Sequence, residues 1–396
     1  MSAKGQLSHI GIGKETIFGT AVPVTDYLKF NSESITEARE ELVSAQMPGR
    51  RDEPESYEGL NTISGETVHE VHPKGLGHLL RSWFGEPVTT LIATGVYQHI
   101  FTPTNTPFSA DCDTHPYTLE IHRDLGSNNA FQYAGCVINT LAFSFGVGAK
   151  IMGLTASWLV KNVANIVKTT PVLETTEPFR WNQAIISIGT EDSGTATGTQ
   201  SGTTLQDTGK SWTVDQYKNH YVRLTGGTGL GQVRKIVSNT ADTLTVSAWG
   251  TEPVSGDTTY EIYASEEKLE TLSLTLENGL VGIPLINNTK VIAKIVGDAF
   301  RSGTIAPTFH TEDLSQYNMY KNWLTKKWYL TFTGATISGN WKYELEFQLP
   351  KVLFTAFPLN VAGPGRITVG ASGKIKYDNT AAHLCRIRLV NDIAAY

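Results

Sequence analysis

Four kinds of segment occur twice along this chain in the same order, and this repeat constrains the possible folds more than any other feature. The order is a strand that ends in histidine, a short amphipathic helix, a strand with the pattern aromatic–polar–Leu–Glu–apolar–polar, and a long β-hairpin. A repeat of whole structural units within one chain indicates a duplicated fold. The first copy occupies residues 66–72, 73–85, 117–122 and 137–160, and the second copy occupies 304–310, 311–324, 343–348 and 352–377.

Each predicted helix carries its own start and stop signals. In the first copy, Pro73 suits the first helical position and Gly85 suits the position that follows the last turn. In the second copy, Thr311 or Asp313 can cap the helix. The apolar spacing gives each helix one buried face. The predicted faces are Leu76, Leu79, Leu80 and Trp83 in the first copy, and Leu314, Tyr317, Tyr320 and Trp323 or Leu324 in the second.

The other segments show the two-residue period of β-strands. From 341 to 349 the odd-numbered residues are all large and apolar, and Glu344, Glu346 and Gln348 alternate with them. Such alternation is typical of a strand with one buried and one solvated face. Charged residues make up only 18% of the chain, and Gly, Ser and Thr are abundant, as in β-sandwiches with many tight turns. We therefore predict a mainly β protein with two tandem β-sandwiches, each flanked by a short helix.

A change in composition marks a third unit. Twelve of the sixteen residues in 189–204 are Gly, Ser or Thr, too polar to bury a face of their own. Short β-branched or alternating segments follow at 221–225, 232–237, 243–246 and 258–263, separated by turn residues. We predict a small all-β module at 185–264, inserted between a first sandwich at 1–184 and a second at 265–396.

Net charge argues against a protein that grips nucleic acid. The chain has 32 Lys and Arg against 38 Asp and Glu, a formal charge of -6, and no basic run longer than a pair. Tight binding to DNA phosphates requires a basic face. Cys112, Cys136 and Cys385 have no metal-site or disulfide spacing, so we expect buried, reduced thiols. With no signal-peptide pattern and no long apolar run, the sequence predicts a soluble protein made in the cytoplasm, away from membranes.

No catalytic, cofactor or metal site emerges from the motifs. His69 and His72 are three residues apart on a predicted strand and would point to opposite faces. The glycine-rich turn 226–231 has neither the strand-to-helix context nor the lysine of a phosphate loop. Ser372 lies outside any nucleophile-elbow pattern. Glu344 and Glu346, spaced like imagined glycosidase carboxylates, fit ordinary strand alternation better. We therefore predict a protein without catalytic activity, cofactor or bound metal.

The charged segment 38–60 is the strongest candidate for an interaction element. A loop of this length inside a compact domain is unusual and often contacts a partner. Its charges have both signs, which suits docking to a complementary surface. The candidate contact residues are Arg39, Glu40, Arg50, Arg51, Asp52 and Glu53.

Several passages of the chain resemble a known family of phage proteins. Residues 11–24, the Pro48-Gly-Arg passage followed by a strand, and the helix that begins Gly75-Leu-Gly-His resemble the major tail tube proteins of long-tailed, siphovirus-type bacteriophages. The 185–264 segment is similar to a small β-domain found inserted in various phage proteins. These patterns cover most of the chain, although none of them is an invariant chemical motif.

The resemblance implies a structural virion protein of the phage tail. Members of the family form stacked rings in which β-sheets join into a barrel, and DNA is delivered to the host through the lumen. Members with a duplicated fold form trimeric, pseudo-hexameric rings, and an N-terminal arm and a long loop reach toward the next ring. The implied partners are further copies of the chain, the tape-measure protein, the tail terminator and tip proteins, and passing double-stranded DNA. Assembly would take place in the cytoplasm of the bacterial host.

The lumen of such a tube must let DNA slide without sticking, so acidic or hydroxyl-rich faces suit it. From strand alternation, the lumen-facing candidates are Glu120, Glu344, Glu346 and Gln348.

Two other classes of function remain open at this stage. The chain could be an adhesive or carbohydrate-binding β-sandwich, such as a tail fibre or receptor-binding module, with Trp212 and Trp249 as sugar platforms, although core tryptophans are commoner. A glycan hydrolase on a β-scaffold is the third possibility. Self-assembly into rings or tubes would distinguish a tail tube protein from both of these alternatives.

Overall fold

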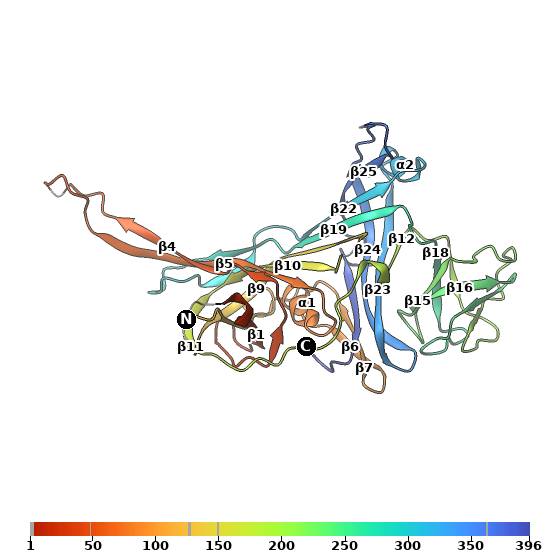
Figure 1. Cartoon of the computed structure of the whole chain (residues 1–396), viewed down its shortest axis with the longest axis horizontal. Helices are drawn as coiled ribbons and strands as arrows, with labels where there is room; N and C mark the ends of the chain where they lie inside the picture. Colours follow the sequence, from red (N-terminus) through yellow and green to blue (C-terminus); the bar gives the residue numbers. More distant parts are fainter. Residues whose placement is uncertain (1–3, 48, 126–127, 149, 362) are drawn as a thin grey trace.

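The computed structural model describes residues 4–396 except 48, 126–127, 149 and 362. It confirms a mainly β protein, with 50% of residues in strands and 6% in helices. Figure 1 shows an elongated molecule, in which a long hairpin projects at one end and a separate β-module lies at the other. The helical segments are α1 (Leu76–Phe84), α2 (Ser315–Lys321) and two short 3-10 turns at Gly5–Leu7 and Trp181–Gln183.

A five-stranded antiparallel layer forms one side of the first half. Its strand order is β2–β1–β8–β9–β11, and β1 is buried between its two neighbours. An N-terminal arm can therefore comprise only residues before His9, because His9–Lys14 is an inner strand of this layer. The bounds are β1 (His9–Lys14), β2 (Asp26–Leu28), β8 (Tyr117–His122), β9 (Asn129–Gly146) and β11 (Asn162–Val167).

The second layer is a long sheet that runs through both halves. The long strand β9 bends from the first layer into this sheet, where it pairs with β10 on one side and β19 on the other. The order is β4–β5–β10–β9–β19–β22–β26–β24–β23–β12, with β3 beside β5 and β25 beside β22. On the side of β24 that β26 occupies, residues 344–348 pair with β27, and the sheet continues from there through β7 to β6.

The bounds of the strands in this sheet are β3 (Ser32–Glu33), β4 (Thr36–Val43), β5 (Ser56–Glu70), β6 (Val88–Ala93), β7 (Val96–Phe101), β10 (Gly153–Val160), β12 (Ala184–Ile188), β19 (Leu269–Glu277), β22 (Ser302–His310), β23 (Thr325–Ser338), β24 (Trp341–Ala356), β25 (Thr368–Gly370), β26 (Ser372–Ile375) and β27 (Arg386–Asn391). A separate two-stranded hairpin is formed by β20 (Leu280–Ile283) and β21 (Lys294–Gly297).

The pairing pattern itself is duplicated. In the first half β10 lies between β5 and β9, and in the second half β26 lies between β22 and β24. Because β9 and β19 pair directly, the halves share one sheet, and they also share one hydrophobic core. The two tandem units predicted from the sequence are thus fused edge to edge in one sheet.

The core explains the position of α1. The four predicted apolar residues are at most 3% exposed, and Trp83, Trp158 and Trp328 are among the largest fully buried side chains. Gly85 has a φ of 100° and its N–H bonds to Arg81 O, so a glycine ends this helix as predicted. The helix begins at Leu76, however, and Pro73 precedes its first turn.

Helix α2 differs more from its prediction. It is only seven residues long, and Asp313 Oδ1 accepts a hydrogen bond from Ser315 N–H at 2.8 Å just before it. Tyr317 and Tyr320 pack against the core. Leu314 and Trp323 are 53% and 66% exposed, so the predicted apolar face is wrong at both ends.

The inserted segment folds as its own six-stranded sheet with its own hydrophobic cluster. Residues 184–188 pair with β23 in the large sheet, so this unit begins after Gly189 and not at 185. The Gly/Ser/Thr-rich segment supplies the strand at 192–195 and the buried Ala196, so it is part of the folded module. In spatial order the strands are β13 (Asp192–Thr195), β18 (Thr259–Tyr263), β15 (Tyr221–Gly226), β16 (Val233–Asn239), β17 (Thr243–Val246) and β14 (Thr204–Gln206).

Candidate assembly surfaces

The predicted interaction loop is a projecting β-hairpin. Strand β4 pairs with β5 from Thr36↔Ser64 to Val43↔Ser56, so only the tip between them is irregular. The sequence predicted a loop here because β4 shows no alternation of buried and exposed residues. All of its residues are exposed. Figure 1 shows the hairpin reaching far beyond the body of the molecule. Pro48, part of the family-like passage, lies outside the described residues.

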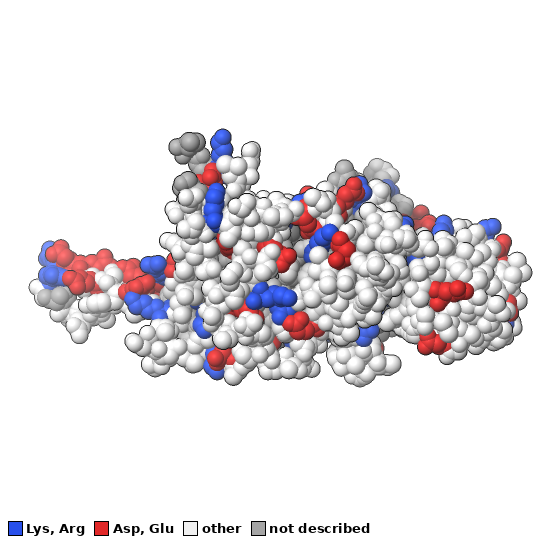
Figure 2. Space-filling view, turned by 90° about the horizontal axis from the view of Figure 1, so that it is seen from below, with Lys and Arg blue, Asp and Glu red and all other residues white. Residues whose placement is uncertain are grey.

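The six predicted contact residues all lie on this hairpin and are all exposed. Arg39 and Glu40 are on β4, and the other four are in the tip between the strands, namely Arg50, Arg51, Asp52 and Glu53. Figure 2 shows acidic and basic side chains crowded along the projection. Apolar side chains accompany them, since Leu42, Met47 and Tyr57 are 47%, 99% and 60% exposed. A charged surface with exposed apolar residues is suited to docking.

The base of the hairpin is held by the second half of the chain. Asn61 N–H donates to Lys290 O at 2.6 Å, and Lys290 pairs with Glu58 at 2.5 Å. Arg39 lies 3.6 Å from the same carboxylate. Ion pairs this exposed contribute little energy, so they orient the hairpin more than they stabilise it.

The large sheet has several strand edges that are unpaired among the described residues, and two of them concern assembly. Strands β3 and β4 pair only with β5, and residues 354–356 of β24 pair only with β26. Beside the first edge lies a groove of about 580 Å³ whose floor includes Phe131 and Tyr133. Open edges present unpaired N–H and C=O groups and are templates for pairing with another chain.

The acidic residues predicted to line a lumen are inside the protein. Glu120 is 1% exposed, and it accepts hydrogen bonds from His9 at 3.0 Å and from the N–H and hydroxyl of Thr169 at 2.7 and 2.8 Å. Glu344 is 6% exposed and pairs with Arg388 at 2.6 Å. The expectation of a solvated acidic face is therefore wrong for these residues.

Glu346 is the most deeply buried of the set, at 0% exposure. Arg223, from the inserted module, donates both terminal nitrogens to its two carboxylate oxygens, and Gln348 donates at 2.7 Å. Burial alone would raise the pKa of Glu346, but the charges of Arg223 and Arg388 outweigh it and hold that pKa below its usual value. The module thus covers this face of β24 and leaves Gln348 half-buried.

The outward face of the large sheet has a different chemistry. Its cross-strand rows consist mainly of small and hydroxyl-bearing side chains, because the registers align Thr155, Ala142, Thr275 and Thr304 in one row. The next row aligns Ser144, Ser273 and Ala306. Sequence reasoning missed this face, although the period-two Ser and Thr positions in 271–277 and 302–308 carry its signal.

The competing classes of function lose their support. Trp212 and Trp249 are 8% and 4% exposed in the module's own core, so neither offers a sugar platform. Within the described residues, no group of three or more His, Cys, Asp or Glu side chains could hold a metal ion. His69 is buried against Lys29 O at 2.7 Å, with a pKa lowered to about 4 by burial. None of the helices in the described part of the chain has the length and apolar character needed to cross a bilayer.

A mainly β protein with open sheet edges and a projecting charged hairpin fits the class of structural assembly proteins. The chain matches the family model described as phage tail tube protein over residues 5–204, which is half of its length. The chain therefore belongs to the phage tail tube protein family, whose members are structural components of the virion tail and not enzymes. Comparison with curated proteins yields no match. The matched range covers the first half and ends within the inserted module.

Proposed function

We propose that three copies of this chain close head to tail into a ring, and that stacked rings form the tube through which phage DNA passes. The observation that carries this proposal is the duplicated pairing pattern. Inside one chain, β9 of the first half accepts β19 of the second half at its edge. The free edge of β24, the counterpart of β9, would accept the counterpart of β19 from the next chain in the same way. Three chains with two units each then complete a closed circle in which these two edges are paired.

The register of this junction can be worked out from the duplication. The two histidine-ended strands align Glu66 with Thr304, a separation of 238 residues. Ser34 donates its N–H to Glu66 O, and Thr275 pairs with Thr304, so Ser34 is the counterpart of Thr275. Likewise Ala356 pairs with Ser372 as Ala142 pairs with Thr155, so Ala356 is the counterpart of Ala142. Because Ala142 pairs with Thr275 inside the chain, Ala356 of one chain should face Ser34 of the next.

The hydroxyl-rich face of the large sheet is the best candidate for the lumen wall. Ser144, Ser273 and Thr304 on this face are exposed and uncharged. DNA slides past such a surface because few cations are available to replace the counterions of its phosphates. We therefore propose this face, and not the buried glutamates, as the lumen wall. Double-stranded DNA would pass along it without tight binding.

The projecting hairpin supports a role in stacking. Its irregular tip projects beyond the body of the molecule, so the charged and apolar side chains of the tip remain free when a ring closes. We propose that it docks on the neighbouring ring. The tape-measure protein and the tail terminator and tip proteins remain the proposed partners, with assembly in the cytoplasm of the bacterial host.

A disulfide trap tests both the register and the number of chains. The double variant Ser34→Cys/Ala356→Cys, oxidised after assembly, should form disulfides between chains. A non-reducing gel should then show a ladder that ends at three chains. The native thiols should contribute little background, because Cys112, Cys136 and Cys385 are at most 1% exposed.

The single variant Ser34→Cys is the control for disulfides formed by chance collision and should stay monomeric on the gel. A ladder that continues to six chains would contradict the trimer. Assembled tubes without any cross-link would contradict the β24 junction.

A further inference from the structure

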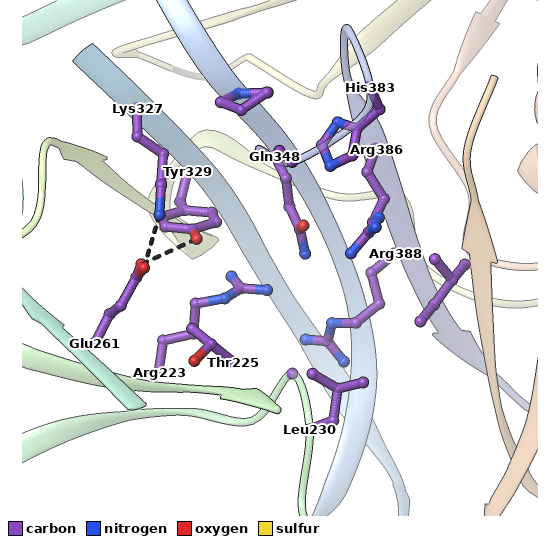
Figure 3. A pocket seen from close by; sticks show the side chains of 14 residues that line it. Arg223, Thr225, Leu230, Glu261, Lys327, Tyr329, Gln348, His383, Arg386 and Arg388 are labelled. Atoms are coloured by element: carbon purple, nitrogen blue, oxygen red, sulfur yellow. Dashed lines mark hydrogen bonds and ion pairs between the residues drawn. The ribbon is translucent and has the colours of Figure 1, made fainter. Parts of the chain in front are cut away.

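A cavity of about 210 Å³ lies where the inserted module meets the large sheet. The module contributes β15, β18 and the glycine-rich turn after β15, and the body contributes β23, β24 and β27. Figure 3 shows the side chains of Arg223, Arg386 and Arg388 directed into a common space. The cavity is therefore lined by cations from both units, and it is separate from the sheet edges and the hairpin.

One of these cations lacks a counter-charge. Arg223 pairs with Glu346, Arg388 with Glu344 at 2.6 Å, and Lys327 with Glu261 at 2.6 Å. Among the described residues, Arg386 has neither an ion pair nor a hydrogen-bond partner for its buried Nε. The four cations of the lining thus exceed by one charge the three carboxylates that pair with them, Glu261, Glu344 and Glu346.

Three buried nitrogen atoms around the cavity have no hydrogen-bond partner among the described residues. They are Nε of Arg386, Nε of Arg388 and Nδ1 of His383. The two arginines are two residues apart on β27, so they project on the same side of the strand. Arg388 itself is only 1% exposed. Several unpartnered donors around one cavity call for a bound ion or water that accepts their hydrogen bonds.

The electrostatics of the cavity agree with this geometry. Burial, together with the charge of nearby Arg386, lowers the pKa of His383 to about 4. Burial and the charge of Arg223 also lower the pKa of Arg386. Both shifts have the sign expected for a surplus of positive charge in a space of reduced solvation.

We propose that this cavity binds one small oxyanion, of the phosphate or carboxylate class, between the module and the sheet. Arg386 would supply the neutralising charge and Arg388 a further donor, and His383 would donate in the tautomer that carries its proton on Nδ1. Planar guanidinium groups match the paired oxygens of both classes. A water molecule takes about 30 Å³ of liquid volume, so the cavity can hold such an anion with part of its hydration. The glycine-rich turn does not supply donors to the anion, because Leu230 and Gly231 already donate their N–H groups to Gly227 O and Leu224 O.

The anion would stabilise the contact between the module and the body. It would contact Arg386 and Arg388 of the body and approach Arg223 of the module, whose own carboxylate partner belongs to the body. This inference does not depend on the tube, because the cavity lies within a single chain and can be tested before assembly.

Calorimetric titration of the unassembled chain in chloride buffer provides the test, with inorganic phosphate and acetate as separate probes. We expect saturable binding of one anion per chain and a higher melting temperature at saturation. The variant Arg386→Gln should weaken binding about tenfold or more, because it removes charge-assisted hydrogen bonds. Arg386→Lys should retain part of the affinity, and its folding by circular dichroism guards against a misfolded variant. Whichever probe binds more tightly identifies the class of oxyanion.

The matched control is Arg366→Gln. Arg366 is exposed, pairs with Glu270 and lies outside the cavity, so its loss should leave anion binding unchanged. The proposal is overturned if neither probe binds saturably to the wild-type chain, which would mean that water alone fills the cavity. It is equally overturned if folded Arg386→Gln binds as tightly as the wild type.

Discussion

The ion pair between Arg223 and Glu346 should be the main polar anchor between the inserted module and the body. Its side chains are 2% and 0% exposed, and the guanidinium carbon also lies 4.2 Å from the centre of the Tyr329 ring. Replacing Arg223 with methionine leaves Glu346 buried without its bidentate partner. Removal of one member of a buried pair costs about 3–5 kcal/mol, because the remaining charge stays desolvated.

Urea unfolding of the unassembled chain, followed by tryptophan fluorescence, measures this loss. The matched control is Lys218→Met, which breaks an ion pair with Asp215 on the module's surface, at 54% and 44% exposure. That pair should contribute about 0–1 kcal/mol. The double variant Arg223→Met/Glu346→Leu should lose less than Arg223→Met alone, because no charge is stranded.

The pair also predicts a pH dependence. The pKa of Glu346 is lowered in the folded chain from an ordinary value of 4.5, so its contribution is fully present above about pH 4.5. This contribution is lost as the pH falls through the lowered pKa. In Arg223→Met the largest influence that lowers this pKa is removed while that of Arg388 remains, so the acid-dependent loss should become smaller. If Arg223→Met costs no more than Lys218→Met and has the same acid profile as the wild type, the anchor is refuted.

Three further predictions concern the hairpin, the module and the core. Arg50→Glu/Arg51→Glu should leave rings intact but impair their stacking, as seen by negative-stain microscopy; normal tubes would reduce the hairpin tip to a solvated surface. Deleting 190–264 and closing the chain with a short linker should still give rings, since Glu266 N–H bonds to Ile186 O at 2.7 Å and the two connections lie side by side; unfolded protein would show that the module is needed by the main fold. Gly77→Ala should destabilise the chain by about 1–3 kcal/mol, because a new Cβ would lie 2.2 Å from the Tyr396 ring; an unchanged thermal midpoint would show that Tyr396 moves aside freely.

Local pattern was sufficient for much of the fold. The strand alternation at 341–349, the glycine that ends α1 and the repeated order of segments all depend on neighbouring residues in the sequence. These features were predicted because a strand or a helix turn is specified by side chains two to four residues apart. The family resemblance rests on the same local passages.

Which faces are buried was decided by tertiary structure. Glu346 lies on the polar face of an alternating strand, yet Arg223 covers it from 123 residues away. The two halves share a sheet because β9 meets β19, a pairing made by backbone hydrogen bonds that no local side-chain pattern specifies. The hairpin was predicted as a loop because no side chains pack on either face of β4, so its sequence has no buried, apolar positions, although its backbone pairing with β5 is intact. Sequence alone thus determined the strands and their repetition, whereas partners far along the chain determined which of their faces meet solvent.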